Sequence, residues 1–402
     1  MIRAQFRLLG RLWRLNPPRD LLWRVLRWSW ALGARELAWQ LSLLLVVVIA
    51  ALLALGAASS TLGLVVLALL TLDLLFELHY AWASLRSARE IEAALEQVPG
   101  EPAPSRFPRS HIAIPPLMLI PRGVRRQRGV VYHRDDGLRL RLDVFRPTGE
   151  QVAGESRPAV VQVHGGGWIA GSRLEQGIPL LNHLAANGWV GFNIDYRLSP
   201  RATLPDHVID VKRAIAWVRD NASELGVDPN RICLTGGSAG GHLAALAALT
   251  AGDTSLQPGF EDADTSVAAA VPFYGVYDML DDDAVYYDGL RSWLLEEIVI
   301  KRRRDEDPEA FRAVSPTYRV HAGAPPFMVF HGEHDSLVPV DDARAFVERL
   351  RAVSANEVLY VELQGAEHAF DLMPSMRTAR VVEGIERFLR TVVADPEPAL
   401  AA

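Results

Sequence analysis

Cysteine is nearly absent from this chain of 402 residues, and the formal net charge is −6. Because Cys233 is the only cysteine, no disulfide can form within the chain. It lies in an apolar run, where we expect it to be buried and inert. The acidic balance gives no nucleic-acid signature, and the sequence has no metal-ligand spacing, phosphate-binding loop or internal repeat. We therefore expect no cofactor, no metal and no nucleic-acid partner.

Charge is missing from two long apolar runs near the amino terminus. No charged residue occurs in 41–58 or in 61–72. Each run approaches the roughly 17 to 25 residues that a helix needs to cross a bilayer. The pattern predicts a transmembrane hairpin within residues 37–82, with helices over about 39–58 and 61–80, although two carboxylates weaken the second run. The alternative is a buried helical hairpin that covers the catalytic domain.

The segment before these runs is basic and amphipathic. In residues 1–36, arginines alternate with leucines and tryptophans, interrupted at Pro17-Pro18. This pattern predicts a helix on an anionic membrane surface, with the amino terminus in the cytoplasm. Two crossings would return the catalytic domain to the cytoplasm, whereas one would export it. We expect a helix and Pro-rich linker over 83–128, the catalytic domain over 129–392 and a disordered tail over 393–402.

A Gly-x-Ser-x-Gly turn at residues 236–240 is the strongest chemical signal. It follows the apolar run 231–235 and precedes the Ala/Leu-rich stretch 242–249, which predicts a strand, a tight turn and a helix. A nucleophile elbow requires this context, because the serine must project above the sheet from a turn in which larger residues would clash. Ser238 is the candidate nucleophile.

A serine hydroxyl needs a base to remove its proton and an acid to orient that base. In this type of site both follow the serine, the acid first, on loops after late strands. The apolar run 326–331 predicts a strand that ends just before Asp335, and 358–363 predicts the next strand, followed by His368. We predict that Asp335 is the acid and His368 the base. The competing residues are Glu333, Asp341, Asp342 and Glu367 for the acid, and His331 and His334 for the base.

Charge that develops on the substrate oxygen requires hydrogen-bond donors. A predicted strand runs into His-Gly-Gly-Gly-Trp at residues 164–168, where glycines let backbone N–H groups approach a ligand. The N–H of Ala239, after the nucleophile, is the expected further donor. We expect Trp168 to line the acyl site or to pack, His164 to hold the loop and His242 to pack beneath the site.

The four motifs HGGGW, GGSAG, HGEHD and EHAF occur in this order. Together they resemble the hormone-sensitive-lipase-like group of α/β-hydrolase esterases over roughly residues 130–390. The resemblance implies an α/β fold with a mostly parallel sheet flanked by helices, a cap over about 275–324, and Gly166, Gly167 and Ala239 as oxyanion donors. One departure is Gly237, where the group commonly has Asp, which bears on the subgroup more than on activity.

The predicted function is hydrolysis of carboxylic esters by a membrane-anchored serine enzyme, without a cofactor. A lipid or another small lipophilic ester is the expected substrate and the bilayer the expected partner; the oligomeric state is left open. Three other acyl chemistries on the same residues remain open: an arylformamidase-like amidase, a prenylcysteine-methylesterase-like enzyme and an acyltransferase. A non-catalytic membrane binding module of the same fold is the alternative from another class.

Overall fold

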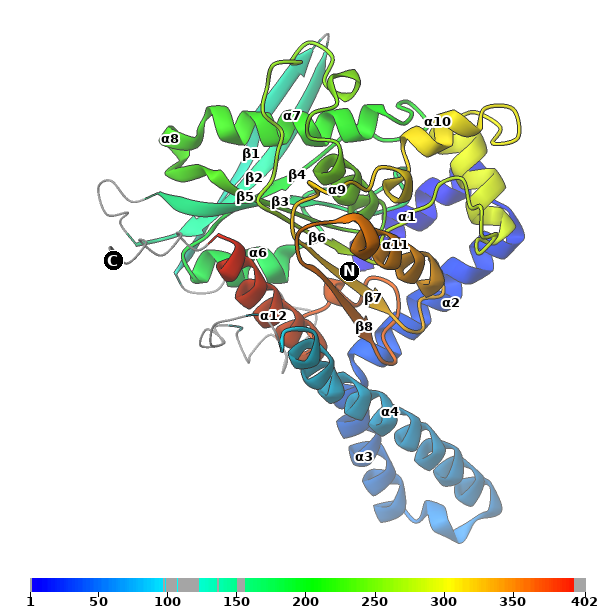
Figure 1. Ribbon diagram of the computed structural model, residues 1–402. Helices are drawn as coiled ribbons and strands as arrows, with labels where there is room; N and C mark the ends of the chain where they lie inside the picture. The colour runs from blue at the N-terminus through cyan, green and yellow to red at the C-terminus, as the bar shows by residue number, and fades with distance from the viewer. Residues whose placement is uncertain are drawn as a thin grey trace.

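One eight-stranded sheet forms the centre of the computed structural model, which describes residues 2–96, 98, 107, 123–135, 137–149 and 156–393 (Figure 1). The strand order is β1-β2-β4-β3-β5-β6-β7-β8. β1 and β2 pair antiparallel, β2 also runs antiparallel to β4, and the strands from β4 to β8 are parallel. Their bounds are β1 Val124–Asp135, β2 Leu138–Pro147, β3 Arg157–Val163, β4 Val190–Ile194, β5 Val227–Gly237, β6 Ala269–Phe273, β7 Phe327–Gly332 and β8 Val358–Leu363.

The central strands are buried on both faces of the sheet. Every residue of β4, β6 and β7 is buried, which explains why these strands appear in the sequence as continuous apolar runs rather than as alternating ones. This α/β-hydrolase-like architecture was predicted from the sequence. The sheet begins at Val124 rather than at residue 129.

Helices cover both faces of the sheet (Figure 1). α6 and α12 pack together on one face, and α7 and α9 pack together on the other, with α11 against β7 and β8. Their bounds are α6 Ile178–Ala186, α7 Asp206–Asp220, α8 Ala222–Leu225, α9 Ala239–Leu249, α11 Val340–Val353 and α12 Met376–Val392. The segment predicted as the cap contains the π-helix η3 Gly289–Ile300, α10 Pro308–Ala313 and the short η4 Pro316–Tyr318; η2 Thr254–Leu256 and η5 Phe370–Leu372 lie in other loops.

Within the part of the chain that the structure describes, four α-helices precede the sheet. They are α1 Ile2–Leu15, α2 Arg19–Glu36, α3 Ala38–Ala54 and α4 Thr61–Ala94, with the short η1 Ala57–Ser59 between the last two. Residues 16–18, which include the Pro-Pro pair, separate α1 from α2, because proline is not accommodated within a helix. α3 and α4 pack as a hairpin that projects away from the sheet (Figure 1).

The hairpin differs from its predicted bounds in both helices. α3 ends at Ala54, before residue 58, and α4 continues to Ala94, past residue 80. The second half of α4 extends because it packs on α12 and β8. A Cβ on Gly384 of α12 would come within 2.4 Å of Ile91, so only glycine allows this close approach. The base of the hairpin is thus fixed to the body of the protein.

The projecting part of the hairpin exposes its apolar side chains, so it does not cover the catalytic domain. Among the described helices, α4 alone is long and apolar enough to cross a bilayer; α3 meets the criterion only together with α2, from which it is bent by 75°. The exposed large apolar side chains of α3 and α4 include Leu43, Leu44, Val46, Val47, Leu53, Leu62, Leu64, Val65, Leu69, Leu72, Leu75 and Phe76.

The apolar face of α2 contacts protein. Leu21, Val25, Trp28 and Leu32, spaced three or four residues apart, are buried against the body of the molecule. The sequence predicted that residues 1–36 lie on a membrane surface. In the structure, the apolar stripe of α2 packs instead on the body of the protein, because the sheet domain offers an apolar surface. Trp23 and Trp30 on the outer face of α2 stay exposed, as does Trp13 of α1. Most of the predicted linker and nearly all of the predicted tail lie outside the described residues.

Candidate active site

Ser238 occupies a sharp turn between β5 and α9. Its backbone has φ 58° and ψ −123°, a strained conformation for a residue with a side chain. The flanking glycines allow this turn. A Cβ on Gly236 would lie 2.3 Å from the carbonyl oxygen of Gly240, and a Cβ on Gly240 would lie 2.2 Å from that of Val163. The strand, turn and helix predicted for a nucleophile elbow are therefore present.

Asp335 and His368 meet at the carboxyl ends of β7 and β8. Asp335 Oδ2 lies 2.6 Å from His368 Nδ1, and both side chains are almost fully buried. Asp335 Oδ1 accepts hydrogen bonds from the N–H groups of Leu337 (2.9 Å) and Val338 (2.8 Å). Burial alone would raise the pKa of Asp335, but His368 and His331 together hold that pKa well below its ordinary value. Asp335 is therefore ionised when it contacts His368.

Two of the competing residues also lie in this cluster, in supporting positions. His331 Nε2 lies 3.2 Å from Asp335 Oδ2 and 3.0 Å from the carbonyl oxygen of Val338, so it helps to hold Asp335 in place. Glu367 Oε1 accepts from the N–H groups of Ser336 (2.7 Å) and His368 (3.0 Å), which connects the acid loop to the histidine loop.

The side chains of the other competing residues have partners other than Asp335 and His368. Glu333 and His334 pair with each other at 3.2 Å on the surface, and Asp341 is exposed beside Arg344. Asp342 is buried, and burial raises its pKa to about 7, while its carboxylate accepts from the N–H groups of residues 277 and 278. It therefore supports the segment that leads into the predicted cap.

The glycine loop at residues 164–168 is held by hydrogen bonds on both sides. The N–H of Gly165 donates to Gln176 Oε1 at 2.6 Å, and the ring of His164 stacks on Tyr196 with its Nδ1 2.8 Å from the carbonyl oxygen of Gly165. Gly166 and Gly167 have φ of 120° and 59°, which favour glycine. Among the described residues, none accepts a hydrogen bond from the N–H of Gly166 or Gly167. The loop can therefore present both donors to a ligand, as can Ala239 in the open first turn of α9.

Trp168 and His242 form a buried layer below this loop. Trp168 Nε1 donates to His242 Nδ1 at 3.2 Å, and His242 Nε2 donates to the carbonyl oxygen of Val314 at 2.8 Å. Burial lowers the pKa of His242 to about 4, so the ring is neutral at physiological pH. Trp168 packs against His242 and also lines the pocket above Ser238.

Comparison with known proteins connects this geometry to a family. The BD-FAE family model matches residues 142–350, a range that contains Ser238 and Asp335 and ends before His368. The probable carboxylic ester hydrolase LipM of Mycobacterium tuberculosis is 47% identical over 280 residues (68% of this chain and 64% of LipM). The esterase LipC of the same organism is 45% identical over 296 residues (72% of this chain and 70% of LipC). The chain belongs to the BD-FAE family of α/β-hydrolase esterases.

Solved structures agree with this family. Esterase 2 of Thermogutta terrifontis, in its structure phosphoramylated by tabun, shares 33% identity with a TM-score of 0.52, over 62% of this chain and 86% of that one. A structure of the same esterase with bound butyrate has a TM-score of 0.51 at 32% identity, over 62% of this chain and 86% of that one. The alignment to LipM spans slightly less than two thirds of that protein.

Tyr274 is a residue of the site that the family motifs do not include and that sequence reasoning missed. Its ring lies 4.6 Å from that of His368, and its hydroxyl donates to the carboxylate of Asp371. A Cβ on Gly237 would lie 2.7 Å from the Tyr274 hydroxyl. Glycine at position 237, where the resembled group commonly has Asp, thus leaves room for the ring of Tyr274. No sequence signal identified Tyr274, because an aromatic residue after a buried strand is usually a packing residue.

A largely apolar pocket lies above Ser238 and His368. The glycine loop at residues 164–168 and the predicted cap form part of its wall, and the amino-terminal helices form another part that the sequence did not predict. The residues that α1 and α2 contribute are Leu8, Leu12, Leu21, Val25 and Trp28, which face Tyr287, Leu290 and Leu294 of the cap segment.

Proposed function

We propose that this protein is a membrane-anchored serine carboxylesterase that hydrolyses lipophilic esters through Ser238, His368 and Asp335. The observation that carries the proposal is the contact of His368 Nδ1 with an ionised, buried Asp335, because His368 lines the same pocket as Ser238. This contact fixes the imidazole with Nε2 free to act as base. The family relatives, which include esterases, support the same chemistry.

In the proposed mechanism, His368 Nε2 removes the proton of Ser238 as the hydroxyl oxygen attacks the ester carbonyl. The N–H groups of Gly166, Gly167 and Ala239 bind the oxyanion, and Asp335 stabilises the imidazolium that forms. His368 then protonates the leaving alcohol. Water attacks the acyl-enzyme by the same route and releases the acid.

The pocket lining supports a lipophilic substrate. Its walls are largely apolar and include aliphatic and aromatic side chains from α1, α2 and the cap segment 275–324. An apolar acyl or alcohol chain gains about 0.8 kcal/mol for each CH₂ that such a surface removes from water. Trp168 would contact the same chain. A lipid or another lipophilic ester therefore fits this pocket better than a polar ester.

The exposed hairpin α3–α4 supports the membrane anchor. Apolar side chains surround its projecting part, and an isolated surface of this size is unfavourable in water. With two crossings, the amino terminus and the catalytic domain both lie in the cytoplasm. Protease accessibility of the catalytic domain in sealed vesicles tests this orientation, since protection in inside-out vesicles would contradict it.

A second candidate is demethylation of prenylcysteine methyl esters by the same residues. The isoprenylcysteine α-carbonyl methylesterase ICME of Arabidopsis thaliana is 32% identical over 247 residues, which cover 58% of this chain and 54% of that protein. A prenyl group is apolar, as is the pocket. A panel of substrates that includes a prenylcysteine methyl ester, simple alkyl esters, an aryl formamide and an alcohol acceptor separates this activity from the others.

Replacement of Ser238 by Ala tests the central assignment. We expect Ser238→Ala to lower kcat on alkyl esters by about 10⁶-fold with the fold intact, since subtilisin loses about this much when its serine is removed. A fluorophosphonate should label the wild-type protein at Ser238 and leave Ser238→Ala unlabelled. Hydrolysis rates over esters of increasing acyl length then define the substrate. Retention of most activity by purified Ser238→Ala would overturn the assignment.

A further inference from the structure

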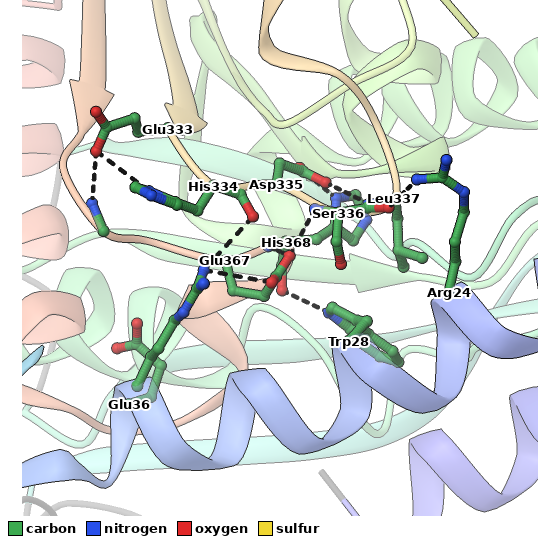
Figure 2. A network of polar contacts seen from close by, with 12 residues as sticks. Arg24, Trp28, Glu36, Glu333, His334, Asp335, Ser336, Leu337, Glu367 and His368 are labelled. Carbon is green, nitrogen blue, oxygen red and sulfur yellow. Dashed lines mark hydrogen bonds and ion pairs between the residues drawn. The ribbon is translucent and has the colours of Figure 1, made fainter. Parts of the chain in front are cut away.

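α2 lies directly against the loops that carry Asp335 and His368 (Figure 2). The indole N–H of Trp28 donates to the backbone carbonyl of His368 at 2.7 Å, in a buried position. Two arginines of the same helix contact the acid loop and Glu367: Arg24 donates to the carbonyl of Ser336 at 3.4 Å, and Arg35 lies 3.3 Å from Glu367 Oε2. Side chains of one helix therefore contact both loops.

His368 is held at three separate atoms. Asp335 binds Nδ1 of the ring, Glu367 accepts from the backbone N–H, and Trp28 donates to the backbone carbonyl. The next residue, Ala369, has φ 62°, an unfavourable conformation for a residue with a side chain. A loop that passes through such a conformation needs bonds from outside itself to keep its geometry. The carbonyl that accepts from Trp28 belongs to the peptide group that joins His368 to Ala369.

α2 is itself fixed at both ends. Near its start, Asp20 accepts from the N–H of Gly289 at the beginning of η3 (3.0 Å). At its end, Glu36 forms a fully buried ion pair with Arg377 (3.0 Å), and Arg377 also donates to Ser87 of α4 at 2.8 Å. Because both ends of α2 are held, this helix can keep the loops that it contacts in fixed positions.

We propose that α2 positions the histidine loop and that Trp28 is its positioning residue, which holds His368 at the angle needed to reach Ser238. The inference rests on the proposed function of His368. Displacement of a reacting group by about 1 Å can cost on the order of 100-fold in rate. The indole N–H therefore affects the rate of the chemical step, whereas the ring surface contributes to the pocket.

Replacement of Trp28 by Phe removes the donor and keeps an apolar ring. We expect kcat on a short alkyl ester to fall about 10- to 100-fold with KM changed by less than about threefold, because the loop shifts while a short acyl chain still binds. Fluorophosphonate labelling of Ser238 should slow in parallel, since the same base removes the serine proton. The matched control is Trp23→Phe on the exposed face of α2, where Trp23 is 70% exposed. The control should retain wild-type kcat.

A second pair of variants keeps the inference testable if Trp28→Phe does not fold. Arg35→Gln removes the ion pair with Glu367, and Arg27→Gln, at an exposed position on the same helix, is its control. We expect a smaller loss of kcat for Arg35→Gln and none for Arg27→Gln. Wild-type kcat in folded Trp28→Phe would overturn the inference, as would a variant in which KM rises and kcat does not change. If Trp28→Phe does not fold, wild-type kcat in Arg35→Gln would overturn it. If the wild type itself has no Ser238-dependent esterase activity, the proposed function fails instead.

Discussion

The serine side and the histidine side of the candidate site are built in different ways. On the serine side, the elbow and the oxyanion loop are two short segments whose glycines let the backbones approach closely, such as Gly240 against Val163. On the histidine side, Asp335 is held by nearby N–H groups, and His368 is held by two side chains from distant parts of the sequence, Asp335 and Trp28. One half therefore depends on the close approach of two backbones, and the other depends on polar contacts of side chains.

This difference predicts how each half fails. A substitution on the serine side should act through steric displacement of the backbone, so even one added methyl group should matter. A substitution on the histidine side should act through loss of a hydrogen bond or charge, so an isosteric change should matter while the fold remains.

The largest effect after loss of the nucleophile is expected for Asp335→Asn. The amide oxygen can still accept from the N–H groups of Leu337 and Val338, so the loop should keep its shape, but the amide cannot stabilise an imidazolium. We expect kcat to fall about 10⁴-fold, as for the equivalent change in a serine protease. Steady-state kinetics on a short ester, with circular dichroism to confirm the fold, measure this effect.

The control for Asp335→Asn is Asp341→Asn, because Asp341 is a nearby carboxylate whose side chain is 64% exposed. It should keep wild-type kcat. If Asp335→Asn remained active while Glu367→Gln lost activity, the acid would be Glu367, and the described geometry of the histidine side would need another interpretation.

An intermediate effect is expected for Gly165→Ala on the serine side. The new Cβ would lie 2.5 Å from the carbonyl oxygen of Gly237 and 3.0 Å from the Cβ of Ser238, so the oxyanion loop must move away from the elbow. Loss of an oxyanion donor typically lowers kcat by about 10²- to 10³-fold. We expect a loss in this range, measured as kcat on the same ester. Gly252→Ala, where nothing lies within 4 Å of the added Cβ, should have no effect. If Gly165→Ala kept wild-type kcat, the serine side would not require the close approach of these two backbones.

The same difference explains what the sequence could predict. The serine side is a continuous strand, turn and helix, so the residues around Ser238 predicted its structure directly. Asp335 and His368 were also identifiable, because each follows a buried apolar strand and parallel strands bring their carboxyl ends to one edge. Their 2.6 Å contact agrees with that expectation.

The contributions of Trp28 and Tyr274 could not be predicted in this way. Trp28 belongs to an arginine-rich amphipathic stretch, and amphipathicity shows that one face is apolar without showing what covers it. Membrane and protein surfaces satisfy the same pattern. The packing of α2 on the domain depends on contacts with residues more than 300 positions away, which no local pattern encodes.

The smallest effect concerns stability on the serine side, through His242. Burial lowers the pKa of His242 in the folded protein to about 4, below the ordinary 6.5. As the pH falls below about 6.5, the unfolded chain binds a proton that the folded protein excludes, so stability is lost progressively down to about pH 4. At pH 5 the loss is about 2 kcal/mol.

The variant His242→Gln tests this pH dependence. Its amide can still donate to Val314, so the variant should be less stable at pH 7 but should lose less stability between pH 7 and pH 5 than the wild type. Urea unfolding at both pH values measures the loss of stability in each protein, and equal losses would show that folding does not lower the pKa of His242.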